Sequence, residues 1–231
     1  MIIKVQNKCP DFNGYRSARV KSLFNAERGD SFSLTAELPV EDIGWQIGLI
    51  VGPSGSGKTS IGRQLFGGGK IVDLYAGWPD DLPIVEAISP DGEFNAVTGA
   101  LANVGLGDVP SWLRPFKALS NGQQFRAGLA RLISDAPDEV IVDEFTSVID
   151  RQIAKIGAMA FGKGWRRNAG KKVVLLACHY DIVEWLQPDW VFDTGTGEFK
   201  KKTKSDPGQV SSWKFGRSTP LIGSTLNRII I

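Results

Sequence analysis

Short apolar runs alternate with longer amphipathic stretches along this chain of 231 residues. The runs at 46–51, 140–142 and 173–177 are predominantly apolar, as expected of strands that helices cover on both faces of a parallel sheet. The stretches at about 58–66 and 150–168 carry apolar side chains at helical spacing. Alternating strands and helices of this kind predict an α/β fold with a mostly parallel sheet.

The parts of the chain around this core have different patterns. Residues 1 to about 45 read as short strands and turns, because the segment 31–38 alternates apolar and polar side chains with a period of two. The stretch 75–118 is rich in Pro, Gly and Trp and holds two modest helical patterns, at about 82–88 and 93–104. We therefore expect an N-terminal antiparallel β part and a reduced helical subdomain beside the parallel core.

The first apolar run leads directly into G-P-S-G-S-G-K-T at residues 52–59, which matches the phosphate-binding pattern G-x-x-x-x-G-K-[ST]. Backbone N–H groups of such a turn surround a phosphate chain, and the dipole of the helix that follows attracts the anion. Glycine allows the backbone to approach the phosphate oxygens closely. The chain is therefore expected to bind a nucleoside triphosphate.

Two side chains of this loop have separate expected roles. Lys58 is expected to reach the β- and γ-phosphates, and the hydroxyl of Thr59 is expected to bind Mg²⁺. The residues expected to surround the phosphates are Gly52, Pro53, Ser54, Gly55, Ser56, Gly57, Lys58, Thr59 and Ser60.

A pair of acids ends the apolar run at 140–142. Asp143 at a strand tip can hold Mg²⁺, and Glu144 can orient and partly deprotonate an attacking water molecule. Two acids after a buried strand, in a chain with a phosphate loop, indicate hydrolysis of a phosphate ester or anhydride.

Composition narrows the class of protein only a little. The formal net charge of +2 is too small to indicate nucleic-acid binding by itself. Two cysteines, Cys9 and Cys178, form no disulfide framework and suit a reducing compartment. No apolar stretch approaches the roughly 20 residues that a membrane-spanning helix needs. These features lead us to expect a soluble, cytoplasmic protein.

Several further segments follow the phosphate loop in a particular order. The run L-S-N-G-Q at residues 119–123 resembles the LSGGQ signature of ATP-binding-cassette (ABC) ATPases, and the run T-S-V-I-D at 146–150 matches their D-loop. Val140 to Glu144 looks like their Walker B strand with its catalytic glutamate, and His179, the only histidine, lies where the family places its switch histidine. The resemblance covers about residues 20 to 199.

The resemblance implies roles for particular residues. Glu144, His179 and Lys58 would be the catalytic residues, acting on ATP, with Mg²⁺ held by Thr59 and Asp143. In this family, the signature of one subunit caps the γ-phosphate bound by the other. The implied working unit is therefore a head-to-tail homodimer that closes on two ATP molecules. The residues assigned to nucleotide binding on these grounds are Ser120, Gly122 and Asp150.

The family also places an aromatic side chain on adenine, about thirty residues before the loop lysine. Phe24 is the best-placed candidate and Phe32 is the next. Each of them is, taken singly, also typical of an ordinary core position.

This chain departs from the family pattern at three points. Residues 65–118 contain no glutamine, so the Q-loop glutamine has no evident equivalent, and Trp78, Asp80 or Asp81 could take its place. The alternative for the two aspartates is a turn that caps the next helix. Asn121 replaces a signature glycine and tolerates a left-handed backbone, which suits such a substitution. Phe145 replaces the common proline after the catalytic glutamate.

These observations predict an ABC-type ATPase domain over residues 1–199, with its helical subdomain at about 75–135, and a basic tail or linker over 200–231. The segments W-L-R-P-F at 112–116 and W-L-Q-P-D-W at 185–190 look like a group of soluble ABC-type ATPases whose longer members carry a C-terminal acetyltransferase-like domain. The tail around residues 221–228 resembles their junction, so the chain could be the ATPase part of a longer protein.

The predicted function is ATP binding and hydrolysis by a soluble ABC-type ATPase. Two alternatives stay open: the nucleotide-binding subunit of an ABC transporter, and an ATP-gated clamp or regulator acting on DNA or protein. The missing glutamine argues against the transporter, because in the family that residue senses a transmembrane partner.

Overall fold

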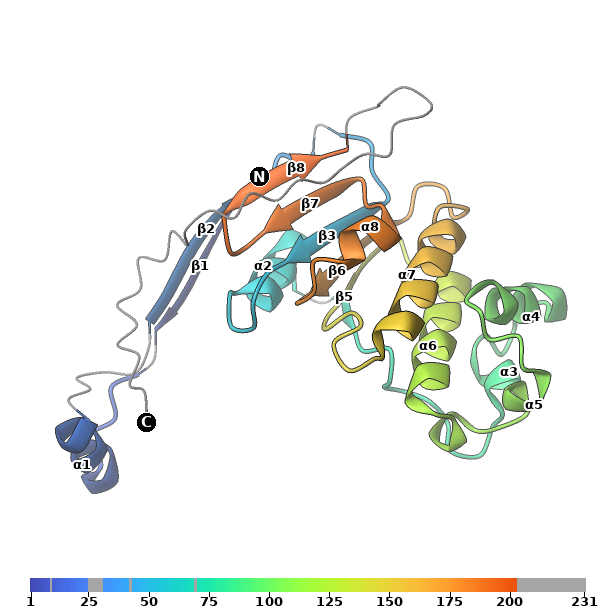
Figure 1. Cartoon of the computed structure of the whole chain (residues 1–231), viewed down its shortest axis with the longest axis horizontal. Coiled ribbons are helices and arrows are strands. Elements are labelled where there is room, and N and C mark those ends of the chain that lie inside the picture. The colour runs from blue at the N-terminus through green and yellow to red at the C-terminus, as the bar shows by residue number, and fades with distance from the viewer. Residues whose placement is uncertain (9, 25–30, 42, 69, 203–231) are drawn as a thin grey trace.

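The computed structural model describes residues 1–8, 10–24, 31–41, 43–68 and 70–202. Its centre is a six-stranded sheet in the order β4-β5-β6-β3-β7-β8 (Figure 1). The first five strands in this order are parallel, and β8 runs antiparallel to β7. The strands are β3 (Ile47–Val51), β4 (Ile71–Val72), β5 (Glu139–Val142), β6 (Lys172–Ala177), β7 (Trp190–Asp193) and β8 (Glu198–Lys201).

The sheet is buried on both faces, which explains its nearly continuous apolar strands. Helix α2 (Lys58–Leu65) covers one face, with Ile61 and Leu65 in one cluster with Leu176 and Phe192, and Ile3 and Leu38 from the N-terminal part join the same cluster. On the other face lie α6 (Asn121–Asp135), α7 (Arg151–Trp165) and α8 (Ile182–Leu186). The predicted α/β fold with a mostly parallel sheet is therefore confirmed.

One glycine within the sheet is needed for packing. A Cβ on Gly48 would lie 2.1 Å from the ring of Trp190, the residue paired with it on β7. Trp190 is fully buried, so its ring has no room to move away. The small residue in β3 thus lets a large aromatic side chain fill the core under α2.

A group of short helices lies beside α6. They are α3 (Ile84–Ala87), α4 (Phe94–Asn103), α5 (Val109–Trp112) and the 3₁₀ helix η1 (Phe116–Ala118). The two helical patterns expected at 82–88 and 93–104 correspond to α3 and α4. The first is shorter than expected because Pro83 caps it and cannot continue a helix backwards. The one-turn elements α5 and η1 are too short to produce a periodic signal.

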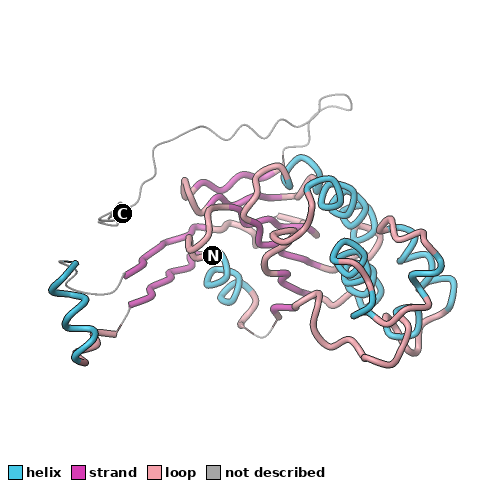
Figure 2. Tube along the Cα trace, turned by 60° about the horizontal axis from the view of Figure 1, so that its bottom comes forward, coloured by secondary structure: helices cyan, strands magenta, loops and turns pink. Residues whose placement is uncertain are grey.

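The N-terminal part differs from the expected series of short strands and turns. Strands β1 (Ile2–Lys8) and β2 (Ser31–Glu37) form an antiparallel pair, as expected, but the connection between them holds a helix, α1 (Tyr15–Phe24). The ribbon extends away from the central sheet and carries α1 at its outer end (Figures 1 and 2). Helix α1 buries none of its residues, so no core-facing apolar stripe marks it in the sequence.

Two further expectations concern the whole chain. Most of the predicted basic tail, residues 203–231, lies outside the described residues, together with the junction-like segment at 221–228. Within the described ranges, none of the helices combines the length and the apolar character that crossing a membrane requires.

Candidate active site

The parallel strands place several functional segments at one edge of the sheet. The phosphate loop follows β3, the acids follow β5, and His179 follows β6, and these three strands are neighbours. Ligands of open α/β sheets bind at this edge, outside the carboxyl ends of the strands. Segments separated by more than one hundred residues thus meet in one region.

The phosphate loop is a glycine turn with left-handed backbone positions. Gly55 has a φ of 77° and Gly57, the N-cap of α2, has a φ of 85°, both values that side chains with a Cβ rarely adopt. A Cβ on Gly52 would lie only 2.0 Å from the Thr194 hydroxyl. Ser56 ties the turn to the end of β7, because its hydroxyl lies 2.5 Å from that of Thr194.

Lys58 lies inside this turn, with only 8% of its surface exposed. Its ammonium donates to the carbonyl oxygens of Gly52 at 2.9 Å and Pro53 at 2.8 Å. The positive charge is therefore held within the curl of the loop, where an anion would be bound. Thr59 and Ser60 occupy the next positions of α2 and are partly exposed.

The acids after β5 sit on a strained turn. Glu144 has a φ of 49° and Thr146 a φ of 66°, although both carry a Cβ. Phe145, between them, donates its backbone N–H to the carbonyl of Leu176 at 2.8 Å and buries its ring between Phe125 and Phe161. This alternation sends the phenyl ring into the core and leaves the Glu144 side chain exposed.

The proline expected after the glutamate could not make the same contact. A proline at position 145 has no N–H to donate to Leu176. The replacement that departs from the family pattern thus supplies a hydrogen bond between the turn after β5 and strand β6.

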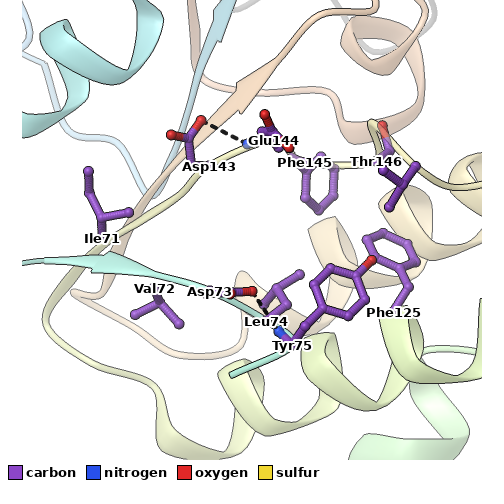
Figure 3. Close-up of a pocket in the computed structure, with 11 residues that line it drawn as sticks. Ile71, Val72, Asp73, Leu74, Tyr75, Phe125, Asp143, Glu144, Phe145 and Thr146 are labelled. Atoms are coloured by element: carbon purple, nitrogen blue, oxygen red, sulfur yellow. Dashed lines mark hydrogen bonds between the residues drawn. The ribbon is translucent and has the colours of Figure 1, made fainter. Parts of the chain in front are cut away.

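Asp143 and Glu144 line a cavity of about 430 Å³ (Figure 3). Asp143 accepts a hydrogen bond from the backbone N–H of Glu144 at 2.8 Å. The opposite wall comes from the segment after β4, including Asp73 and Tyr75. Val72 pairs with Val142, so Asp73 and Asp143 leave neighbouring strands at equivalent positions.

Sequence reasoning missed Asp73, although a polar residue at the end of the short run 71–72 was a usable signal. The burial of Tyr75 and the nearby carboxylate of Asp73 raise the pKa of the Tyr75 phenol, so this wall of the cavity presents a neutral phenol.

Two of the residues proposed to replace the Q-loop glutamine have partners close to them in the structure. The Trp78 ring stacks on Phe116 with ring centroids 4.4 Å apart, and its indole N–H donates to the Leu74 carbonyl at 3.0 Å. Asp80 forms an ion pair with Lys117 at 2.7 Å. The alternative role for the two aspartates, a turn that caps the next helix, is wrong, because Pro83 is the N-cap of α3 and no side chain caps this helix. Whether one of the three residues replaces the glutamine stays a prediction.

His179 lies in the turn after β6 and is exposed. The next residue anchors this turn, since the Tyr180 hydroxyl donates to Asp193 at the end of β7 over 2.9 Å. Burial and this hydrogen bond raise the pKa of the Tyr180 phenol well above its usual value, so the phenol keeps its proton. The backbone carrying His179 is thereby held against the strand next to the phosphate loop.

The signature segment opens α6, on the face of the sheet opposite α2. Ser120 is its N-cap and forms a capping box with Gln123: the serine hydroxyl accepts from the Gln123 N–H at 3.4 Å, and the Ser120 N–H donates to the Gln123 side chain at 2.9 Å. A Cβ on Gly122 would lie 2.7 Å from Ile153 of α7, so this glycine is needed for helix packing.

Asn121 is the first residue of α6, and its φ is not among the positive values. The left-handed backbone invoked for this residue is therefore wrong, and asparagine is accommodated because the position is an exposed helix start.

Asp150 is the N-cap of α7 within its own subunit. Its carboxylate accepts from the N–H groups of Gln152 at 2.9 Å and Ile153 at 3.4 Å. The side chain is exposed, so it can also face a second subunit.

Phe24 is not beside the phosphate loop. It ends α1, at the outer end of the β1–β2 ribbon, while α2 packs against the central sheet (Figures 1 and 2). Half of its surface is exposed, at 50%. Spacing along the chain suggested an adenine contact, but the helix and ribbon that hold Phe24 carry it away from α2. The side chain of the second candidate, Phe32, lies outside the described part of the structure.

A parallel sheet with a glycine-rich phosphate loop between a central strand and a helix, and acids at the end of a nearby strand, defines a P-loop NTPase. No protein-family model matches the chain. Over 152 residues it is 32% identical to the cytochrome c biogenesis ATP-binding export protein CcmA of Paracoccus denitrificans, covering 58% of this chain and 70% of that protein. The chain therefore belongs to the ATP-binding-cassette family.

Other relatives agree with this assignment. The taurine import ATP-binding protein TauB of Pseudomonas putida is 28% identical, over 83% of this chain and 92% of its own length. Among solved structures, the dimeric ABC transporter cassette MJ0796 superposes with a TM-score of 0.55 at 16% identity, covering 76% of this chain and 93% of that chain. A second structure of that cassette is a dimer in a post-hydrolysis state with ADP and phosphate, with a TM-score of 0.55 and 16% identity over 74% of this chain and 92% of that chain.

Proposed function

We propose that this protein binds ATP with Mg²⁺ and hydrolyses it to ADP and phosphate. The observation that carries the proposal is the ammonium of Lys58 held inside a left-handed glycine turn, at the edge where Asp143 and Glu144 leave the sheet. Membership of the ABC family makes ATP the expected nucleotide. A cytoplasmic location, where ATP is abundant, is part of the proposal.

Binding rests on groups that the fold already holds in place. The amides at the start of α2 and the ammonium of Lys58 bind the β- and γ-phosphates. On binding, the lysine gives up its hydrogen bonds to the carbonyls of Gly52 and Pro53 and donates to charged phosphate oxygens in their place. Thr59 and Asp143 supply a hydroxyl and a carboxylate, the hard oxygen ligands that suit Mg²⁺. When bound, Mg²⁺ neutralises charge on the phosphate oxygens.

Hydrolysis needs a positioned water molecule and a group that accepts its proton. Glu144 is exposed at the edge of the cavity and takes this role, accepting a proton as the water oxygen bonds to the γ-phosphorus and the bond to the β–γ bridging oxygen breaks. His179 donates a hydrogen bond to the γ-phosphate and holds it beside Glu144. Both side chains act mainly by orientation.

We propose that the complete site forms between two copies of the chain. Ser120 and the first amides of α6 make an anion site on the face opposite α2, remote from the phosphate loop of the same subunit. A head-to-tail dimer would bring the signature of one copy to the γ-phosphate held by the other, with Asp150 at the boundary. The solved cassette MJ0796, which shares this fold at 16% identity, is a dimer, and this supports the proposed arrangement.

The decisive experiment measures phosphate release and Mg-ATP affinity for the wild type and for Lys58→Ala. The variant loses a charge-assisted contact of roughly 1.5–3 kcal/mol, so its affinity should fall at least about tenfold, together with its hydrolysis. Lys163→Ala, an exposed position on α7, is the matched control and should behave as the wild type. Wild-type affinity in Lys58→Ala contradicts the proposed nucleotide site.

A second candidate is a role as the ATP-binding subunit of a transporter, because the relatives CcmA and TauB carry names of that kind. Against it stands the absence of glutamine from residues 65–118. A regulator acting on DNA or protein is the remaining alternative. Tagged protein should be purified from detergent extracts, where co-purification of a membrane protein supports the role in a transporter. Its ATPase rate should then be measured with and without DNA, and stimulation by DNA supports the role as a regulator.

A further inference from the structure

Arg151 joins two turns of the proposed active site. It is the first residue of α7, directly after Asp150, and its guanidinium makes two hydrogen bonds to the carboxylate of Asp181, one of them at 3.1 Å. The same group lies 4.9 Å from the ring of Trp185 on α8, and donates to the Thr146 hydroxyl at 3.5 Å. Its three partners lie on two segments of the chain, because Asp181 is the N-cap of α8, the helix that carries Trp185, whereas Thr146 lies in the turn after β5.

These partners are close in sequence to the proposed catalytic residues. Thr146 is two residues after Glu144, and Asp181 is two residues after His179. A planar guanidinium that is paired with both carboxylate oxygens and also stacked on a ring has little freedom to rotate. The contacts of Arg151 therefore set the turn carrying Glu144 relative to the turn carrying His179.

The ion pair itself is too exposed to be mainly a source of stability. The side chains of Arg151 and Asp181 are 36% and 42% exposed, and ion pairs at such positions contribute little to folding. The turn that Arg151 holds, in contrast, is strained, because Thr146 is buried and has a left-handed backbone. Such a conformation persists only where neighbouring groups hold it.

We propose that Arg151 is a positioning residue for ATP hydrolysis, which holds the Glu144 turn and the His179 turn in the geometry that hydrolysis requires. The inference rests on the proposed function and adds a residue that acts through the two turns rather than on the nucleotide itself. Its place directly after Asp150 also ties both turns to the end of the D-loop, which the proposed dimer would contact. Hydrolysis should thus depend on Arg151, whereas nucleotide binding at the phosphate loop should not.

The first test compares Arg151→Ala and Asp181→Asn with Arg166→Ala. Arg166, at the other end of α7, is a matched control: it donates to the Gln187 carbonyl at 2.5 Å and pairs with Asp189 at 3.6 Å, far along the helix from the proposed site. We expect kcat to fall roughly tenfold in the first two variants and to stay unchanged in the control. The Kd for Mg-ATP should stay within about twofold of the wild type in all three.

The second test asks whether Arg151 acts through His179. In a His179→Ala background, Arg151→Ala should slow hydrolysis by a clearly smaller factor than in the wild-type background, because one of the two turns that Arg151 positions no longer carries its functional side chain. If Arg151→Ala slows hydrolysis by the same factor in both backgrounds, Arg151 acts independently of His179, and the inference is overturned. Arg151→Lys keeps the charge but loses the planar group that makes two hydrogen bonds to one carboxylate, so its kcat should lie between those of the wild type and Arg151→Ala. The lysine variant replaces the alanine variant if the latter does not fold.

Amide hydrogen exchange provides a readout that needs no activity. In Arg151→Ala, but not in Arg166→Ala, the amides of residues 144–147 and 179–181 should exchange faster, and unchanged exchange in both turns overturns the inference. If the wild type shows no ATP hydrolysis that depends on Lys58, the proposed function is wrong. Amide hydrogen exchange still tests whether Arg151 holds the two turns. If hydrolysis depends on Lys58 but Arg151→Ala matches the control, only the role of Arg151 fails.

Discussion

Glu144 is exposed because the residue after it is buried. With a φ of 49°, its backbone turns sharply enough for Phe145 to enter the core, where its N–H meets the carbonyl of Leu176. A carboxylate held at the cavity edge by a strained turn has few alternative positions, which favours its action on one water molecule. The strained backbone conformation and the proposed role in accepting a proton thus belong to the same residue, Glu144.

Glu144→Gln should keep Mg-ATP binding and slow hydrolysis by about 10²-fold or more, because the amide cannot accept a proton from water. Single-turnover phosphate release and calorimetry measure the two effects separately. Glu184→Gln, an exposed change on α8, is the control and should leave both unchanged. Near wild-type turnover in Glu144→Gln removes this residue from the role of base.

Among the elements, α6 and α7 decide how the turn after β5 is supported. Phe125 on α6 and Phe161 on α7 enclose the ring of Phe145, with centroid distances of 5.7 and 6.1 Å. Gly122 and Gly157 allow these helices to approach, since a Cβ at either position would lie within 2.7 Å of a side chain on the other helix. Helix α6, which follows the signature, and helix α7, which follows the D-loop, therefore share one packed core with the turn that carries Glu144.

Phe145→Ala should lower the free energy of unfolding by about 3–5 kcal/mol, because it removes a fully buried ring from this cluster. Denaturant titration followed by far-UV circular dichroism measures the change. Phe94→Ala is the matched control, since that ring is 71% exposed, and its effect should stay within about 0.5 kcal/mol. A loss below 1 kcal/mol for Phe145→Ala would mean that the cluster does not support the turn.

At the scale of the whole molecule, the proposed anion sites at the starts of α2 and α6 belong to helices on opposite faces of the sheet. One chain thus offers two complementary halves of a nucleotide site without joining them. Two ATP molecules buried between copies would bind the dimer and not the separated chains, and so would shift the equilibrium by mass action.

With Mg-ATP, the slow variant Glu144→Gln should shift from monomer to dimer in size-exclusion chromatography with light scattering. Adding Ser120→Arg should prevent the shift but not ATP binding, since a bulky side chain would fill the space of the opposing γ-phosphate. Ala169→Arg, just before β6 at the opposite edge of the sheet, is the control and should dimerise normally. A dimer that tolerates Ser120→Arg, or no dimer in Glu144→Gln, contradicts the composite site.

The fold class, the phosphate loop and the order of the family motifs could be predicted from the sequence alone. Each of these is local: periodicity marks buried strands, and G-x-x-x-x-G-K-[ST] needs only a strand before it and a helix after it. The assignments of Lys58, Glu144, His179 and Ser120 stay predictions, but they arose from signals of this kind. Helix α1 was missed for the same reason, since a helix that buries none of its side chains within the described residues has no core-facing apolar stripe.

Contacts between residues far apart in the sequence could not be predicted, because they depend on how the strands and helices are arranged. Phe24 has suitable spacing for an adenine contact, yet the ribbon carries it away from α2, and Asp73 comes beside Asp143 only because β4 pairs with β5. Arg151 joins Thr146, Asp181 and Trp185 because α7 and α8 pack on the same face of the sheet. Contacts of this kind depend on helix packing and strand order, which no local run of residues encodes.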